Sequence, residues 1–193
     1  MPSKHQNSKI RYFHREVIMR KQIILDLKEK IESTGNNIDP ILLATLIIKW
    51  LHAYPSLQKE FLDHRIDISV FMNMKILDIP NYPIRKSSID FYDLEALKRQ
   101  IDISIKGKHS SIYQPIKNLL EILFVIQKPD MKCNICHGIY GFDLWKEIHT
   151  NRLVYCCKTC NFAEYVNGEV KNDEKPLTMP TNNDLSILGS EIV

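Results

Sequence analysis

The sequence predicts a mainly α-helical protein: an N-terminal helical domain, then a small β-rich module built around four paired cysteines. Apolar residues recur at helical spacing over most of residues 10–127. All five cysteines of the 193-residue chain lie between 133 and 160. The segment 153–170 combines β-prone residues with an Asn-Gly pair, which is typical of a short hairpin. The length suits one medium domain or two small ones.

The first predicted helix covers residues 10–34. Its apolar residues follow alternating steps of three and four, with Arg20 in one core position, and Gly35 ends it. We expect the helix to pack on its own domain, and a homodimer through helix 10–34 is the alternative. The apolar stripe comprises Ile10, Phe13, Val17, Ile24, Leu27 and Ile31.

A second helix is predicted over residues 40–54. Asp39 is a favourable cap, and Pro40 suits the first helical position. Because this segment is apolar on nearly every side, we expect it to form the centre of the N-terminal core. A short helix over 56–64 and another over 68–77 follow; the latter has an apolar composition that a strand could also have.

The rest of the N-terminal part is predicted as a loop and two helices. Residues 79–88 contain two prolines and a basic pair, so we expect an exposed loop. Helices are predicted over 90–105 and 112–127, and Pro129 ends the second. These elements place the α-helical domain at residues 8–128.

The two cysteine pairs predict a metal site. Cys133 and Cys136 are separated by two residues, as are Cys157 and Cys160, and twenty residues lie between the pairs. Two such pairs are typical of a four-thiolate zinc site with one structural Zn²⁺. Since disulfide-rich domains spread their cysteines, this clustering favours metal binding in a reducing compartment.

The residues beside the cysteines fit this interpretation. The residue after each second cysteine usually has a left-handed backbone, and His137 and Asn161 tolerate that conformation. Cys156 is predicted not to be a ligand, because only its neighbour Cys157 has the three-residue step to Cys160. The alternatives are a swap between these neighbours, or replacement of one thiolate by His137 or His149.

Short strands are predicted around the second cysteine pair. Residues 153–155 lead into the pair, 162–166 follow it, and Asn167-Gly168 favours a hairpin turn that returns over 169–170. Residues 140–152 fit a third strand and loop, or a short helix from Asp143.

Together, the cysteine pairs and strands resemble a zinc ribbon over residues 131–171, followed by a flexible acidic tail at 172–193. A zinc ribbon after a helical domain is similar to the arrangement in transcription factors such as the transcript-cleavage elongation factors. The resemblance implies docking to a polymerase or to nucleic acid. Those factors carry an adjacent Asp-Glu at a hairpin tip, whereas Asp143 and Glu147 here are four residues apart. Stimulation of cleavage is therefore not implied.

A second resemblance is to HNH-type nucleases, which often carry two such cysteine pairs around a catalytic metal. The segment Glu147–Cys157 contains His149 and Asn151. Only Thr150 separates them, whereas the family has a longer loop, and no histidine follows Cys160. A degenerate nuclease is the less favoured alternative, and we assign no catalytic residue.

Basic and aromatic residues are interleaved within the module, as in proteins that contact phosphates and stack on bases. The candidate contact residues are Trp145, Lys146, Arg152 and Lys158. The alternative is that the aromatic residues form a small core while the lysines maintain solubility. The net charge of +3 does not by itself indicate nucleic acid.

The expected location is intracellular, in the cytoplasm or nucleus, with no membrane association. Residues 1–9 are polar, and the most apolar run, 41–48, is much shorter than the ~20 residues of a membrane span.

From the cysteine pairs and the resemblance to zinc-ribbon factors, we expect a nonenzymatic zinc-ribbon factor that binds nucleic acid or a transcription or replication assembly. The alternative is a protein-binding adaptor, inhibitor or immunity-type protein that contacts a single protein partner.

Overall fold

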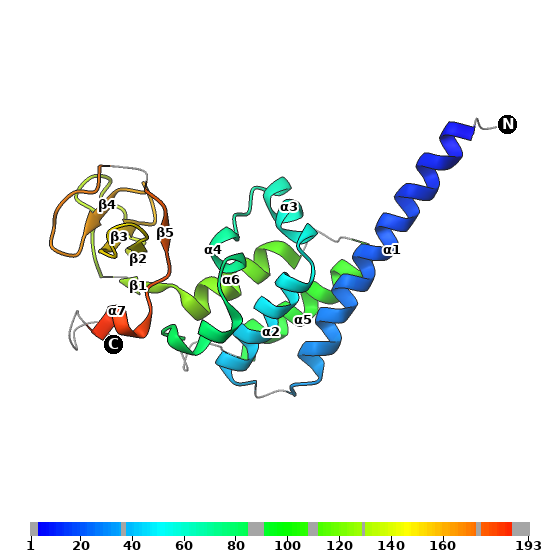
Figure 1. Cartoon of the computed structure of the whole chain (residues 1–193), viewed down its shortest axis with the longest axis horizontal. Helices are drawn as coiled ribbons and strands as arrows, with labels where there is room; N and C mark the ends of the chain where they lie inside the picture. The colour runs from blue at the N-terminus through cyan, green and yellow to red at the C-terminus, as the bar shows by residue number, and fades with distance from the viewer. Residues whose placement is uncertain are drawn as a thin grey trace. The chain divides into compact units, whose positions relative to one another are not determined.

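The protein has a mixed fold of helices and sheet. About half of the chain is helical, and a small antiparallel sheet follows the main helices. This corrects the expectation of a mainly α fold. Residues 126–128, where the sequence predicts the end of a helix and a linker, and residues 177–178, predicted as part of the tail, are strands of the sheet. The computed structural model describes residues 4–35, 38–84, 91–107, 112–128, 130–172 and 175–186, without the side chains of 4–17 and 91–93 (Figure 1).

Residue contacts divide the chain into two compact units. The first comprises Met1–Met72 and Lys86–Leu119, and the second comprises Asn73–Arg85 and Leu120–Val193. The division falls within helix α6 (Tyr113–Phe124). The two units are defined only by how densely their residues contact one another, which does not show that either folds independently. The domain boundary at 128–131 therefore stays a prediction.

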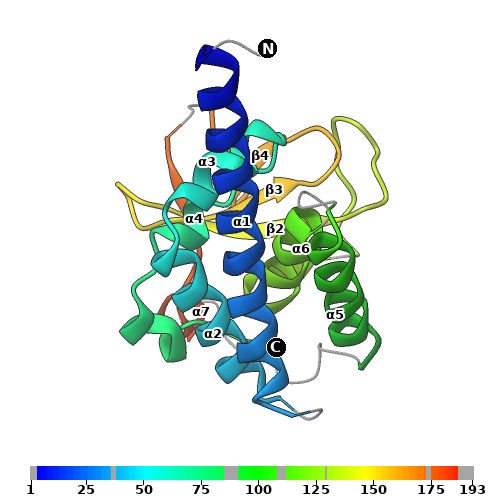
Figure 2. The ribbon, with the colours of Figure 1, turned by 90° about the vertical axis from the view of Figure 1, so that its right-hand side faces the viewer.

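Helices of the first unit pack around α1, which contacts both α2 and α5 (Figure 2). Four of the residues that α1 contributes to the core are Ile23, Ile24, Leu27 and Ile31. The Trp50 Nε1–H of α2 donates to the Ile23 carbonyl at 2.9 Å. The helices are α1 (Lys4–Glu32), α2 (Pro40–Ala53), α3 (Ser56–Asp63), α4 (Ser69–Met72), α5 (Phe91–Ile105) and the first part of α6.

This packing agrees with the expectation that the helix packs on its own domain, and it bears on the alternative of a homodimer through helix 10–34. Ile24, Leu27 and Ile31 belong to the stripe that a dimer would use, and the unit's own core buries them. The side chains of Ile10, Phe13 and Val17 lie outside the described residues. A dimer interface along the whole apolar stripe would therefore require side chains that the core already buries. The homodimer stays an alternative that these contacts do not test.

The predicted start of α2 is confirmed. The Asp39 carboxylate accepts hydrogen bonds from the backbone N–H groups of Ile41 and Leu42, at 2.8 and 3.1 Å, and Pro40 opens the helix. One side of the helix differs from the prediction, because the Leu42 side chain is 49% exposed. The core side consists of Leu43, Ala44, Ile47, Ile48, Trp50 and Leu51.

The predicted helix over 68–77 is wrong in its length. Asp67 caps the Ser69 N–H at 2.8 Å, but α4 ends after one turn at Met72. A 3₁₀ helix, η1 (Ile76–Asn81), follows. Ile79 within η1 is fully buried, so the predicted exposed loop begins later than residue 79, and residues 85–90 lie outside the description.

The second unit contains the sheet, whose strands pair in the order β1-β2-β3-β4. A fifth strand, β5, pairs with β2 beyond the end of β1, at Lys146 and Glu147. The predicted helix over 112–127 ends at Phe124, because Ile126 and its neighbours pair with β2 instead. The strands are β1 (Ile126–Lys128), β2 (Phe142–Glu147), β3 (Leu153–Cys157), β4 (Ala163–Tyr165) and β5 (Leu177–Thr178).

Residues 175–186 are not the flexible tail that the sequence predicts. Leu177 and Thr178 pair with β2, and Met179 is buried. Helix α7 (Asn182–Ser186) packs Leu185 against an apolar cluster of the sheet, formed by Ile126, Leu144 and Leu153. Apolar side chains of this otherwise polar segment thus contact the sheet. Residues 187–193 lie outside the description.

Within the described ranges, no single helix has the length and apolar character that crossing a membrane requires. Only α2 and α3 taken together meet that criterion, as a pair bent by 98°.

Candidate metal centre and its surroundings

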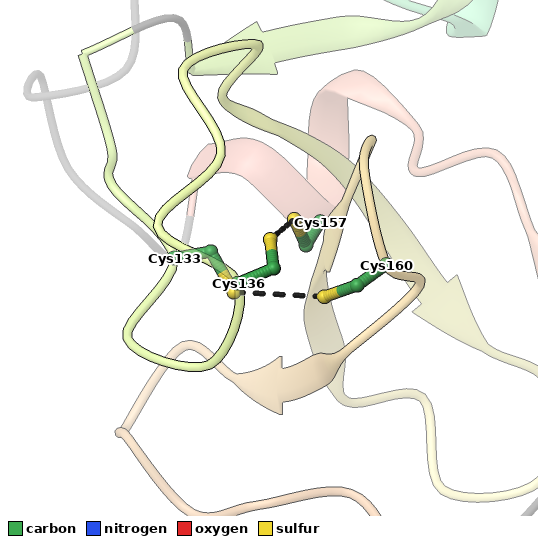
Figure 3. Close-up of side chains that lie close together, drawn as sticks. All are labelled: Cys133, Cys136, Cys157 and Cys160. Atoms are coloured by element: carbon green, nitrogen blue, oxygen red, sulfur yellow. Dashed lines mark hydrogen bonds between the residues drawn. The ribbon is translucent and has the colours of Figure 1, made fainter.

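Two loops of the second unit bring four cysteine thiols together. Cys133 and Cys136 lie in the loop that precedes β2, which we call the first cysteine loop (130–141). Cys157 ends β3, and Cys160 lies in the turn before β4. Figure 3 shows the four side chains converging from these two loops. The structure thus brings together all four cysteines that the sequence assigns as metal ligands.

The sulfur spacing fits a tetrahedral metal site. The four Sγ atoms lie within 4.8 Å of one another. Cys133 Sγ is 3.7 Å from Cys160 Sγ, and Cys136 Sγ is 3.6 Å from Cys157 Sγ. Four thiolates around zinc, each at ~2.3 Å, would be ~3.8 Å apart in a regular tetrahedron. The four cysteines could therefore hold one metal ion such as zinc.

Backbone geometry in both loops supports this arrangement. His137 and Asn161 have φ of 54° and 60°, which confirms the predicted left-handed positions. Their N–H groups donate to the carbonyl oxygens of Cys133 and Cys157, at 2.9 and 3.0 Å, and so close both turns. The same turn chemistry therefore recurs at both pairs.

Backbone N–H groups also point at two of the sulfurs. Gly138 N–H donates to Cys136 Sγ and Thr159 N–H to Cys157 Sγ, both at 3.4 Å. Burial of Cys157 opposes its ionisation, but the N–H groups of Cys160 and Thr159, with the neighbouring thiols, lower its pKa to about 6. Such donors favour the thiolate, which is the form that binds metal.

Gly138 lies against the opposite loop. A Cβ built at this position would be 2.8 Å from Thr159 Cβ, closer still to its hydroxyl oxygen, and 3.1 Å from Cys136 Sγ. The absence of a side chain thus lets the two cysteine loops approach each other. Beneath them, Phe142 packs with the buried Cys133 and Cys157.

Cys156 lies outside the thiol cluster. It pairs with Asp143 across the sheet, whereas Cys157 pairs with Phe142, and neighbouring strand residues point to opposite faces. Burial, followed by the Asp143 carboxylate, raises the pKa of the Cys156 thiol to about 11. A protonated thiol on the other face is a poor ligand. His137 and His149 are both exposed. Within the part of the chain that the structure describes, neither contributes a nitrogen to the group of possible metal ligands.

The four predicted contact residues do not form one cationic surface. Lys146 Nζ is 2.8 Å from an Asp184 carboxylate oxygen, and Lys158 Nζ is 3.7 Å from Asp143. Trp145 is half-buried on β2. Since the positive charges have acidic neighbours, their attraction for phosphate is reduced.

Arg152, the fourth predicted contact residue, contacts three neighbouring side chains. Its guanidinium carbon lies 3.5 Å from the centre of the Tyr165 ring. Its Nη2 donates hydrogen bonds to Glu169 at 2.6 Å and to Asn167 at 3.2 Å. This arrangement was not predicted, because the only sequence signal was that Arg152 lies within an aromatic-rich segment.

A buried polar cluster at the end of β2 was missed entirely. The Glu147 side chain is fully buried, and Lys171, whose side chain is 3% exposed, lies 3.7 Å from it. Lys175 Nζ is 3.8 Å away, while Thr150 and Tyr165 donate hydroxyl hydrogen bonds to Glu147. A glutamate followed by a turn gives no sequence signal for such burial.

Comparison of the chain with protein-family models, with curated proteins and with solved structures found no match to any of them.

Proposed function

We propose that the four cysteines bind one zinc ion in a structural, ribbon-like module. The spacing of the four Sγ atoms carries this proposal. A sulfur-only set of this geometry suits zinc or an iron–sulfur centre, and zinc is the common occupant of a closed structural site. A small unit that lacks a large core gains folding free energy from such an ion.

Metal analysis of the purified full-length chain tests this proposal. We expect about one zinc per chain and no stoichiometric iron. Iron with a visible absorption band, or no bound metal after purification without chelators, would contradict it.

We further propose that the protein is a nonenzymatic factor whose second unit binds nucleic acid or a transcription or replication assembly. The supporting observation is the Arg152–Tyr165 stack beside an open cleft, since planar side chains of this kind bind bases. Four thiolates would leave the metal no open position for catalysis. A reducing intracellular compartment would suit the thiols.

Titration of the full-length protein with labelled single- and double-stranded DNA and RNA tests this role. We expect saturable binding of at least one of these nucleic acids. Because Lys146, Arg152 and Lys158 have acidic neighbours, we expect a smaller salt dependence than several released counterions would give. Absence of binding to all four at low salt would overturn the proposal.

Binding of a single protein partner is the second candidate function. Three apolar side chains on the first cysteine loop are strongly exposed: Ile135 at 63%, Ile139 at 79% and Tyr140 at 70%. A loop held by metal would present them without a large ordering cost. Copurification of a stoichiometric protein from the native host, and its loss in Ile139→Asp, would favour this candidate.

A further inference from the structure

The second unit contains a cleft that the metal site does not use. It has a volume of about 350 Å³ and lies beside the start of β3 and the end of β4. Leu153 and Val166 provide apolar walls, while polar groups come from Asn151, Arg152, Asn167 and Asp184. A concave site with apolar walls and a few converging polar groups is the usual form of a ligand site.

Arg152 provides a fixed flat surface in this cleft. One face of its guanidinium lies on the Tyr165 ring, and Nη2 is held by Glu169 and Asn167. The side chain is nevertheless 38% exposed. The contacts found among the described residues hold one face and one edge of the guanidinium, and none of them lies on the opposite, outer face. This face is preorganised, so a flat ligand can stack on it without first ordering the side chain.

The polar groups around this face suit the edges of a nucleobase. Bases stack on guanidinium planes as they do on aromatic rings. The Asn151 amide offers both a donor and an acceptor. The Asn167 oxygen already accepts from Arg152 and from the Glu169 N–H, so this amide offers its N–H donors. The Asp184 carboxylate already accepts from Lys146 and Thr181 and contributes a polar wall. Asn151 has a φ of 58° at the end of the β2–β3 turn, and this left-handed conformation sets the direction in which its side chain leaves the backbone.

Charge at the cleft favours a base over a phosphate. Arg152 is paired with Glu169, and Asp184 is paired with Lys146. These two cations and two anions balance, which removes most of the attraction for a phosphate group. The stacking face is unaffected by this pairing, because the carboxylate of Glu169 contacts the edge of the guanidinium.

We propose that this cleft binds one unstacked nucleobase against the outer face of Arg152. The base would belong to a single-stranded nucleic acid or to a free nucleotide. This inference rests on the proposed nucleic-acid role and specifies the residues and the chemical group that are recognised.

The test uses the zinc-loaded full-length protein and three fluorescent or competing probes: a single-stranded decamer, the same decamer with abasic residues, and a nucleoside monophosphate. Anisotropy gives the affinity of wild type, Arg152→Lys and Arg152→Ala. Lys49→Ala is the matched control, since it removes an exposed cation that lies outside the cleft and is not one of the candidate contact residues. Zinc content and the thermal midpoint verify that each variant is folded.

We expect the abasic decamer to bind wild type about tenfold more weakly than the complete decamer, in line with the usual strength of base stacking. Arg152→Lys keeps the charge and the proximity to Glu169 but loses the plane, so it should abolish this difference. Lys49→Ala should preserve it. Arg152→Ala should act like Arg152→Lys, and the latter alone decides the matter if the alanine variant does not fold.

Each other outcome has a definite meaning. If the monophosphate competes with the affinity of the decamer, the site is supported and assigned to free nucleotides. If the decamer binds but Arg152→Lys keeps the abasic difference, this inference is overturned while the proposed function stands. If no nucleic acid or nucleotide binds, both are overturned in favour of a protein partner.

Discussion

Gly138 shows how a single residue can control the approach of the two cysteine loops. Its position leaves no room for a Cβ beside Thr159. Since Gly138 also donates its N–H to the Cys136 sulfur, a shift of this backbone would move a sulfur of the proposed zinc site.

Gly138→Ala is therefore expected to weaken zinc binding by about tenfold or more, as changes next to metal ligands usually do. Competition with a chromophoric zinc chelator measures the affinity. Thr159→Gly removes both the Cβ and the hydroxyl that the new methyl group would meet, so the double variant should recover most of the affinity. Equal affinities for wild type and Gly138→Ala would show that the loops adjust without cost.

Cys156 and Cys157 are adjacent residues with different surroundings. Cys156→Ser is expected to retain about one zinc per chain, because its thiol lies on the other face of β3. Cys157→Ser should lose most of the metal, since it removes one of the four grouped sulfurs. Metal analysis after gel filtration measures both. Loss of zinc in Cys156→Ser alone would reverse the assignment of the ligand.

At the scale of elements, β5 and α7 are held on the sheet by a charged pair as well as by apolar contacts. Lys146 and Asp184 are both largely shielded from solvent, with side chains 19% and 14% exposed. Although burial opposes ionisation, hydrogen bonds from Lys146 and Thr181 lower the pKa of the Asp184 carboxyl. The ionised form therefore stabilises the folded state.

Asp184→Asn is expected to lower the free energy of unfolding at neutral pH by about 1–2 kcal/mol. A lowered pKa contributes stability above the ordinary value of 3.8, and this contribution is lost as the pH falls through the folded-state value. The gap between wild type and variant should thus shrink below about pH 3.8. Urea unfolding of both proteins at matched pH measures the difference in the free energy of unfolding. Any metal loss that both proteins share at low pH contributes equally to both values.

Asn183→Ala serves as the control, because this exposed residue lies in the same helix. It should change stability far less than Asp184→Asn. A gap between wild type and Asp184→Asn that stays constant from pH 7 to pH 3 would mean that ionisation of this carboxyl does not stabilise the fold.

For the whole molecule, the two units differ in what stabilises them. The first buries a large helical core that includes Trp50 and Phe61. The second has a small sheet with apolar clusters of a few residues, and the thiol group lies within one of them. Metal binding should therefore be a larger part of the second unit's stability.

Removal of zinc with a chelator is expected to expose the backbone amides of β3 and β4 to hydrogen exchange, while those of α2 stay protected. Exchange measured by mass spectrometry on the full-length protein separates these segments. Simultaneous loss of protection in α2 would show that the units unfold together. Unchanged protection in β3 would show that the metal does not stabilise the sheet.

The sequence by itself determined the local features of this protein. The start of α2 at Asp39, the left-handed residues His137 and Asn161, and the spacing within each cysteine pair depend on neighbours within a few positions. Hydrogen bonds of caps and turns join such neighbours, so spacing and residue type are sufficient to predict them.

Only the tertiary structure decided the features that join distant residues. The buried pairing of Glu147 with Lys171, the stacking of Arg152 on Tyr165 and the pairing of β5 with β2 are of this kind. The local sequence around a lysine, an arginine or a short apolar segment does not show whether the side chains lie in solvent or against a sheet. Its surroundings depend on the register of strands that meet only after folding.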